Sequence, residues 1–305
     1  MHEGCRHITP HAFSALKRAG QEDEGMFKDE FQAVANAAKG KAALLKKNPL
    51  GYFLASMLAG LFIAFGTFIS NGAAAPFYEA GDPMQRIMSS ATFAAALSFV
   101  ICCGAELFTG NNFVLAAAGF RKELKWGEIV KIWIICYIGN LVGSLIGAVV
   151  YQLSGVPTGA VAELFASAAE SKMTASPVAL LLKGILCNTL VCMAVWCSIK
   201  LKSDSGKLIM VFWCIFTFMI CGFEHSVANM FYVPVGILAK GVPEYAQAAA
   251  EAGVDLSGLN WQSFLQGNLL PVTLGNIVGG LAVGVIYWYC YLKDKKEQER
   301  KAGRF

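Results

Sequence analysis

Long apolar stretches without a charged side chain run along this sequence. No Asp, Glu, Lys, Arg or His occurs in residues 48–78, 132–162 or 256–292. Each stretch is longer than the roughly 20 apolar residues that an α-helix needs to cross a bilayer. The pattern therefore predicts an integral membrane protein made of α-helices. Apolar, charge-poor windows predict six membrane-spanning segments, at residues 50–74, 86–119, 127–151, 177–199, 208–238 and 266–292.

The second and fifth of these segments are too long for one straight span. The second contains Glu106 followed by the polar run 109–112, and the fifth contains Gly222, Glu224 and His225. Unwound backbone at membrane depth is tolerated only where protein or a water-lined cavity satisfies its N–H and C=O groups. We therefore expect both segments to be helices broken midway by a polar turn.

An internal repeat relates the two halves of the chain. The string Cys-Gly-Ala-Glu at 103–106 matches Cys-Gly-Phe-Glu at 221–224, and Gly-Asn-Leu-Val-Gly at 139–143 matches Gly-Asn-Ile-Val-Gly at 275–279. Because three spans per repeat is an odd number, the second copy must cross the bilayer upside down. This is an inverted 3+3 repeat, the plan of many channels and transporters, whose substrate path lies between paired broken helices.

The lysines and arginines of the loops predict the orientation. They concentrate in the loops on the side of the N-terminus, and the loops of the other side carry Arg86, Lys172 and Lys240. Positive residues favour the cytoplasmic side, so both termini are expected to be cytoplasmic. We expect residues 1–47 to form a cytoplasmic N-terminal tail, 48–292 a transmembrane channel domain and 293–305 a cytoplasmic C-terminal tail.

Composition and motifs exclude several functional classes of protein. Of 305 residues, 56% are hydrophobic and 15% charged, and the mean hydropathy is +0.51. The net charge of +4 is not gathered on a basic face, so no nucleic-acid partner is expected. All ten cysteines except Cys5 lie in apolar segments without a CxxC pair, and we predict small buried hydrophobes. Motifs of hydrolases, nucleotide-binding proteins and redox enzymes are absent, so neither an enzyme nor a cofactor is expected.

Few residues at membrane depth could carry chemistry. His225 lies at the predicted break of the fifth segment and could donate a hydrogen bond or a proton to an anion, or tie down the broken loop. Glu106 and Glu224 are expected to accept hydrogen bonds from the freed backbone N–H groups, a role favoured over contact with a substrate. The remaining candidates are neutral polar residues that either bridge helices or line a path: Thr109, Asn111, Asn188 and Asn229.

One lysine is placed unusually. Lys183 lies about two turns into the fourth segment. It either extends its amine back to the interface or faces a vestibule and attracts anions. Lys172, just before that segment, could attract anions in the same way.

Four ordered motifs resemble the formate/nitrite transporter family. They are AELFTGN at 105–111, NTLVCMAVW at 188–196, GFEHSVANMF at 222–231 and PVTLGNIVGG at 271–280. The resemblance covers residues 40–292 and implies an aquaporin-like fold, a pore through each protomer and a homopentamer. Position by position, it implies an outer apolar constriction at Phe93 and Phe218, an inner one at Leu97 and Phe108, Thr109 on a mobile loop, central polar contacts from Asn188 and His225, and Lys172 at the outer mouth.

The expected function is passive or proton-linked transport of small monovalent anions, formate and possibly nitrite, across the cell's inner membrane. The partners expected are these anions, protons and membrane lipids. Other members of the same family carry nitrite, hydrosulfide or lactate, and these substrates stay open. An anion-binding membrane sensor is an alternative from another class, favoured by the polar segment 1–47. A water or glycerol channel is disfavoured because the chain lacks two Asn-Pro-Ala caps.

Overall fold

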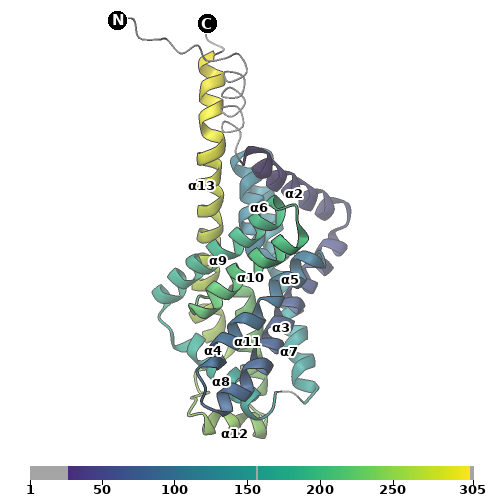
Figure 1. The fold of residues 1–305 in the computed structure, drawn as a ribbon. Helices are drawn as coiled ribbons and strands as arrows, with labels where there is room; N and C mark the ends of the chain where they lie inside the picture. Colours follow the sequence, from purple (N-terminus) through teal and green to yellow (C-terminus); the bar gives the residue numbers. More distant parts are fainter. Residues whose placement is uncertain (1–26, 156, 303–305) are drawn as a thin grey trace, which may run out of the picture.

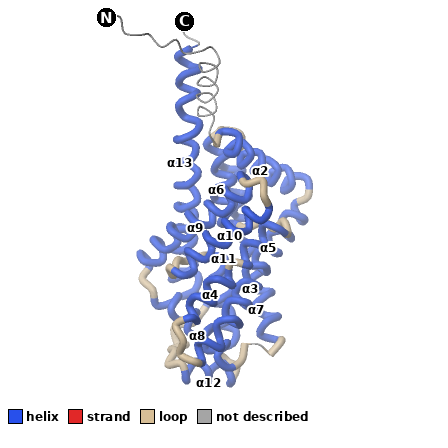
Figure 2. The backbone as a smooth tube through the Cα atoms, viewed as in Figure 1, coloured by secondary structure: helices blue, strands red, loops and turns tan. Residues whose placement is uncertain are grey.

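The protein is helical throughout the part of the chain that the structure describes. This computed structural model describes residues 27–155 and 157–302, with side chains up to residue 291, and has no strand in those ranges (Figure 1 and Figure 2). In chain order the helices are α2 Lys28–Lys47, α3 Pro49–Glu79, α4 Met84–Phe93, α5 Ala95–Cys102, α6 Phe108–Phe120, α7 Trp126–Leu153, α8 Gly159–Thr174, α9 Pro177–Lys200, α10 Asp204–Ile220, α11 Ser226–Ala239, α12 Pro243–Glu251, the π-helical turn η1 Ser263–Leu269 and α13 Leu270–Ala302.

Several of these helices have membrane length. Five stretches are long and apolar enough to cross a bilayer: Pro49–Glu79, Met84–Cys102, Trp126–Leu153, Pro177–Lys200 and Ser263–Tyr291. Helix α11 is apolar but shorter. The prediction of an all-helical membrane fold is confirmed, while the count of six spans stays a prediction.

Helix α3 shows how such a helix divides its surface. Large apolar side chains four or seven residues apart are exposed along one face, at Leu50, Leu54, Leu58, Phe65 and Ile69. A soluble protein does not expose such an apolar stripe along a whole helix, whereas a membrane protein can expose it to lipid. The opposite face of α3 is buried against α7 and α4.

The matching helices α3 and α9 begin in the same way. Each has a proline in its first turn, Pro49 or Pro177, where the missing N–H removes no helix hydrogen bond. The residue before it, Asn48 or Ser176, caps the helix by accepting a hydrogen bond from the backbone N–H three residues on, at 2.9 and 3.3 Å. The local sequence therefore fixes where both helices start.

Glycines allow the helices of each half to approach closely. A Cβ on Gly143 of α7 would overlap the carbonyl oxygen of Met57 on α3, and one on Gly279 of α13 would overlap that of Ile185 on α9. These two contacts occupy matching positions of the two repeats. Such small residues at helix crossings are typical of membrane interiors, where close van der Waals packing holds helices together.

Two short non-helical connections lie at matching positions of the repeat. Residues 103–107 separate α5 from α6, and residues 221–225 separate α10 from α11. Both contain a glycine with positive φ, Gly104 at 73° and Gly222 at 70°, a conformation that glycine adopts without a Cβ clash. Each connection thus starts a new helix, α6 or α11, whose N-terminus lies inside the protein.

Three helices were not anticipated from the hydrophobic pattern: α2, α8 and α12. Helix α2 buries Phe31, Val34, Ala35 and Ala38, which recur at helical spacing on one face. It packs against α6, whereas α8 packs against α11. Figure 1 shows α2 toward one end of the molecule and α8 with α12 toward the other.

Candidate functional site

Two cavities lie at the two ends of the helix bundle. The α8 cavity has a volume of about 360 Å³ and is lined in part by Lys172, Lys183 and Glu224. The α2 cavity has a volume of about 270 Å³ and is lined in part by Lys41 and Glu106. Both are large enough to hold a small hydrated anion, since one water occupies about 30 Å³ in the liquid.

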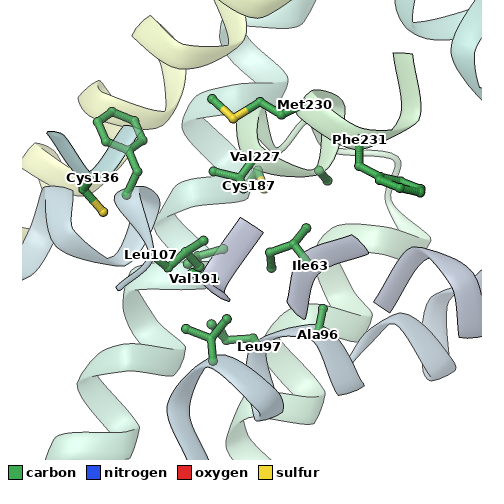
Figure 3. Close-up of a cluster of buried hydrophobic side chains, with 14 of the residues drawn as sticks. Ile63, Ala96, Leu97, Leu107, Cys136, Cys187, Val191, Val227, Met230 and Phe231 are labelled. Carbon is green, nitrogen blue, oxygen red and sulfur yellow. The ribbon is translucent and has the colours of Figure 1, made fainter. Parts of the chain in front are cut away.

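A narrow apolar space separates them, and we call it the constriction. Its volume is about 10 Å³, no more than a single water needs. Aliphatic side chains from four helices and from the 103–107 connection form most of its wall: Ile63, Ala96, Leu97, Leu107, Val191 and Ile215. Figure 3 shows several of them gathered between the helices. The wall is completed by Phe93, Phe218 and His225.

The three spaces form one interrupted path. Phe218 and His225 line both the α8 cavity and the constriction. Leu97 and Leu107 line both the constriction and the α2 cavity. A solute moving between the cavities would therefore pass the aromatic side first and the leucine side second, or the reverse.

Phe93 and Phe218, which the sequence assigned to one constriction, are brought together. Their ring centroids lie 6.0 Å apart at an interplanar angle of 81°. The Phe218 ring also stacks on the His225 imidazole, at 6.0 Å and 17°. The aromatic side of the constriction therefore has a polar ring directly behind an apolar one.

Phe108 does not line the constriction, in contrast to the sequence assignment. Its ring packs edge-on against Tyr137 at 4.8 Å, and its backbone N–H, the first of α6, donates to Asn140 Oδ1 at 2.9 Å. Leu107, one residue earlier, faces the constriction beside Leu97. The reason is that α6 begins at Phe108, so its side chain already follows the helical direction toward α7.

His225 is fixed by a hydrogen bond at each ring nitrogen. Its Nδ1 accepts from the Ala228 N–H at 3.1 Å, which makes His225 the cap of α11. A nitrogen that accepts is unprotonated, so the neutral ring carries its proton on Nε2. That Nε2–H faces Thr109 Oγ1 at 2.9 Å. The structure thus joins the two broken helices through a donor that points at a hydroxyl, with both side chains buried.

Asn188 is buried beside this pair and bridges helices. Its Nδ2 lies within hydrogen-bond distance of the carbonyl oxygens of Thr109 (3.1 Å) and Asn276 (2.6 Å) and of Asn112 Oδ1 (3.2 Å). Its Oδ1 has no partner among the described residues. Asn188 is not part of the cavity walls described above, so its amide supports Thr109 from behind.

Each cavity contains a lysine–glutamate pair in which the glutamate is also bound by an asparagine. In the α2 cavity, Lys41 Nζ lies 2.7 and 2.8 Å from the Glu106 carboxylate, which also accepts from Asn111 at 2.9 Å. In the α8 cavity, Lys172 Nζ lies 3.0 and 3.2 Å from the Glu224 carboxylate. Glu224 also accepts from Asn229 at 2.7 Å. Charge pairing and hydrogen bonds together make such buried carboxylates tolerable.

The glutamates do not hold the freed backbone, which corrects the sequence prediction. Asn140 and Asn276 do so instead. Asn276 donates to the carbonyl oxygens of Gly184 and Glu224 at 2.9 and 3.0 Å and accepts from the Ser226 N–H at 2.9 Å. Asn140 makes the matching set around Glu106. An amide suits this position because it donates and accepts at once, whereas a carboxylate can only accept.

Lys183 faces a cavity, as in the second of the two positions predicted for it, and does not extend its amine to the membrane interface. It lines the α8 cavity together with Lys172 and His225 and is half-buried. Lys172 is paired with Glu224, whereas Lys183 lies within ion-pair distance of no acid in the described ranges. Its backbone carbonyl accepts from the Glu224 N–H at 3.4 Å, so the chain at Lys183 adjoins the second break.

The cysteines are only partly buried, which corrects another prediction. Cys136, Cys187, Cys192 and Cys214 are buried, but four others are exposed: Cys102, Cys103, Cys221 and Cys290. Three of the exposed ones lie where α5 and α10 end, and helix ends are the places where a connection leaves the packed interior. Among residues 27–155 and 157–302, no group of His, Cys, Asp and Glu is arranged to hold a metal ion.

Sequence reasoning missed Lys41, which it had assigned to a polar tail. The repeat carried no exact signal for it, because Lys41 lies eight residues before Pro49 whereas Lys172 lies five residues before Pro177. Leu107 was missed as well. It follows Glu106 as His225 follows Glu224, so the repeat placed a wall residue there.

Comparison with known proteins agrees with this architecture. The family model described as "Formate/nitrite transporter" matches residues 28–289. The formate channel FocA of Escherichia coli K12 is 34% identical over 256 residues, covering 81% of this chain and 89% of FocA. The nitrite transporter NirC of Salmonella typhimurium is 33% identical over 284 residues, covering 90% of this chain and 96% of NirC.

Solved structures show the same fold. One described as an "FNT family ion channel" superposes with a TM-score of 0.75 at 32% identity, covering 87% of this chain and 99% of that one. A "pentameric formate channel with formate bound" gives a TM-score of 0.71 at 30% identity, covering 81% and 99%. With its membrane-length helices, this chain is a multi-pass membrane protein, and it belongs to the formate/nitrite transporter family.

Proposed function

We propose that this protein passes formate, and nitrite as a second substrate, across the membrane along the path from the α8 cavity through the constriction to the α2 cavity. The observation that carries the proposal is the continuity of this path, in which the same four side chains line successive spaces. Relatives named as a formate channel and a nitrite transporter, and the formate-bound pentamer, support these substrates.

The constriction is the main barrier to an anion. Its wall is almost entirely apolar, and it is too small for an ion that keeps its water shell. Removing a charge from water without a compensating partner carries a penalty of several kcal/mol or more. A formate ion that takes up a proton becomes a neutral acid and avoids most of this penalty. We therefore propose that the substrate crosses the constriction together with a proton.

His225 and Thr109 are proposed to assist at the aromatic side of the constriction. The anion would approach from the α8 cavity, which His225 also lines. The Nε2–H of His225 is bound to the Thr109 hydroxyl oxygen. Thr109 is buried and lines none of the three spaces, so its hydroxyl would meet a carboxylate only if the path widened beside His225. Phe93, Phe218, Leu97 and Leu107 would exclude water from the acid while it passes.

The orientation in the membrane is proposed from the charges of the loops, and the assembly from a related structure. We propose that the α2 cavity faces the cytoplasm, because the loops at that end carry most of the lysines and arginines. Residues 48–292 would form the channel domain, with 1–47 and 293–305 on the cytoplasmic side of the inner membrane. Of the first segment, residues 28–47 form α2, and its residues Ala37 and Lys41 line the α2 cavity. Five copies would form the functional unit, as in the formate-bound pentamer.

Uptake of labelled formate into proteoliposomes tests the proposal. We expect saturable uptake that rises as the outside becomes more acidic, because protonation of the anion then accompanies entry. Unlabelled nitrite, lactate and hydrosulfide, added in turn as competitors, rank the substrates. No uptake above that of protein-free liposomes at any pH would contradict formate transport.

A further inference from the structure

The walls of the two cavities correspond position by position through the internal repeat. Gly222 and Glu224 of the α8 cavity match Gly104 and Glu106 of the α2 cavity, 118 positions earlier in the sequence. On α3 and α9 the same relation runs over 128 positions, as between Pro49 and Pro177. Any chemical difference between matched positions therefore distinguishes one end of the path from the other.

Four matched pairs differ in polarity, and all in the same direction. The α8 side carries the polar or charged member and the α2 side the apolar one. Three pairs line the two cavities: His225 with Leu107, Tyr232 with Val114 and Asn71 with Ile199. In the fourth pair, Lys183 lines the α8 cavity, and its match Ala55 is not part of the α2 cavity wall. The backbone confirms that the last pair is matched, because Lys183 O accepts from Glu224 N–H as Ala55 O accepts from Glu106 N–H.

Lys183 gives the α8 cavity an excess of positive charge. The charged side chains of this wall are Lys172, Lys183 and Glu224, and the first and third neutralise one another. The amine of Lys183 is left without a counter-charge in the described part of the chain. In the α2 cavity, Lys41 and Glu106 are the charged pair and neutralise one another.

Asn71 adds an unused donor to the same wall. Its side chain is only 5% exposed, and its Nδ2 has no hydrogen-bond partner among the described residues. A buried amide N–H₂ without an acceptor is uncommon, because it has given up its bonds to water. At the edge of a cavity of about 360 Å³, the missing acceptor can be supplied by a ligand.

We propose that the α8 cavity contains a carboxylate-binding subsite formed by Lys183 and Asn71, and that the α2 cavity lacks it. The ligand class is a small monocarboxylate, whose two oxygens can accept from an ammonium and an amide at once. The inference rests on the proposed transport of such anions. The subsite would raise the affinity for formate arriving from the α8 side and leave that from the α2 side unchanged.

Binding is measured on the purified full chain by saturation-transfer NMR, following the single C–H proton of formate. Lys183→Met keeps the aliphatic stem and removes the charge, and Asn71→Leu keeps the volume and removes the donor. Both variants should weaken binding roughly three- to tenfold. Lys240→Met is the matched control, because it removes one charge from a lysine that does not line the cavity and should bind as the wild type does.

Transport from each side gives the second readout. In oriented membrane vesicles, both variants should raise the half-saturating formate concentration from the α8 side by a similar factor and not from the α2 side. Equal binding by wild type and both variants would overturn the subsite. So would a change of equal size from both sides. If formate binds to the wild type, binds more weakly to the variants and does not cross the membrane, the subsite would be upheld and the proposed transport contradicted.

Discussion

His225 combines the start of a helix with a position on the path. Its Nδ1 is used in capping α11, and its Nε2–H is used on Thr109, a residue 116 positions away in the sequence. A second proton could enter only at Nδ1, where it would face the Ala228 N–H instead of accepting from it. We therefore expect His225 to act through its Nε2–H, as a donor that sets the orientation of the Thr109 hydroxyl.

Replacing His225 by asparagine separates these two roles. An asparagine in the capping position can still accept from the Ala228 N–H, so α11 should form normally. The donor to Thr109 is lost, and we expect formate uptake to fall and to lose its rise at acid pH. Labelled uptake over a pH series measures this, with the melting temperature as the check on folding. Full uptake with an unchanged pH profile would contradict the role given to His225.

Asn276 supports the second break through three backbone groups. Asn276→Leu would remove the amide's hydrogen bonds to the Glu224 carbonyl and the Ser226 N–H in the interior, and its additional bond to the Gly184 carbonyl, which helix α9 also pairs. We expect a loss of about 3–5 kcal/mol in the free energy of unfolding. Asn71→Leu is the control, since it removes an amide nitrogen that has no partner and should leave stability unchanged or raised. Thermal unfolding in detergent compares the two, and equal melting temperatures would argue against the bridging role.

At the scale of elements, helix α2 is held to the bundle by charged groups in addition to its buried apolar face. Lys39 Nζ lies 2.9 Å from the Glu123 carboxylate in the loop between α6 and α7, and Arg121 lies 2.6 Å from the same group. Gln32 of α2 donates to it as well. Burial opposes ionisation of Glu123, but these hydrogen bonds outweigh it and lower its pKa to about 2.

Because the pKa of Glu123 is lowered in the folded state, its ionised carboxylate stabilises that state at pH values above the ordinary pKa of 4.5. This contribution is lost as the pH falls toward about 2. We therefore expect α2 of the wild type to become less protected in this range. Glu123→Gln should show the lower protection already at neutral pH, with little further change on acidification. Hydrogen exchange of α2, corrected for intrinsic rates, measures both. Parallel pH profiles for the two proteins would contradict the contribution of Glu123.

The elements also show how far sequence carries the prediction. Apolar length predicted the starts of α3 and α9 to within a residue, because this signal is local. Helix α2 was missed, because its buried positions are few and lie within a polar segment. The repeat pointed to the breaks, but it did not separate Phe108 from Leu107. Which of two neighbours faces the path depends on the residue at which α6 begins, and contacts with α7 decide that.

At the scale of the whole molecule, the family assignment predicts assembly. Several helices expose rows of large apolar side chains, and part of this surface would be covered by neighbouring copies and part by lipid. We expect native mass spectrometry of the detergent-solubilised protein to give five times the chain mass of 32.7 kDa. A species of another size, stable across detergents, would contradict the pentamer.

The constriction has an electrical consequence. An apolar gap of about 10 Å³ between the two cavities offers an ion little solvation and therefore opposes the passage of net charge. An acid that carries its own proton crosses without net charge, whereas chloride, which binds no proton at physiological pH, would have to carry current. A cell could therefore leave this path open to formic acid while keeping its membrane potential intact.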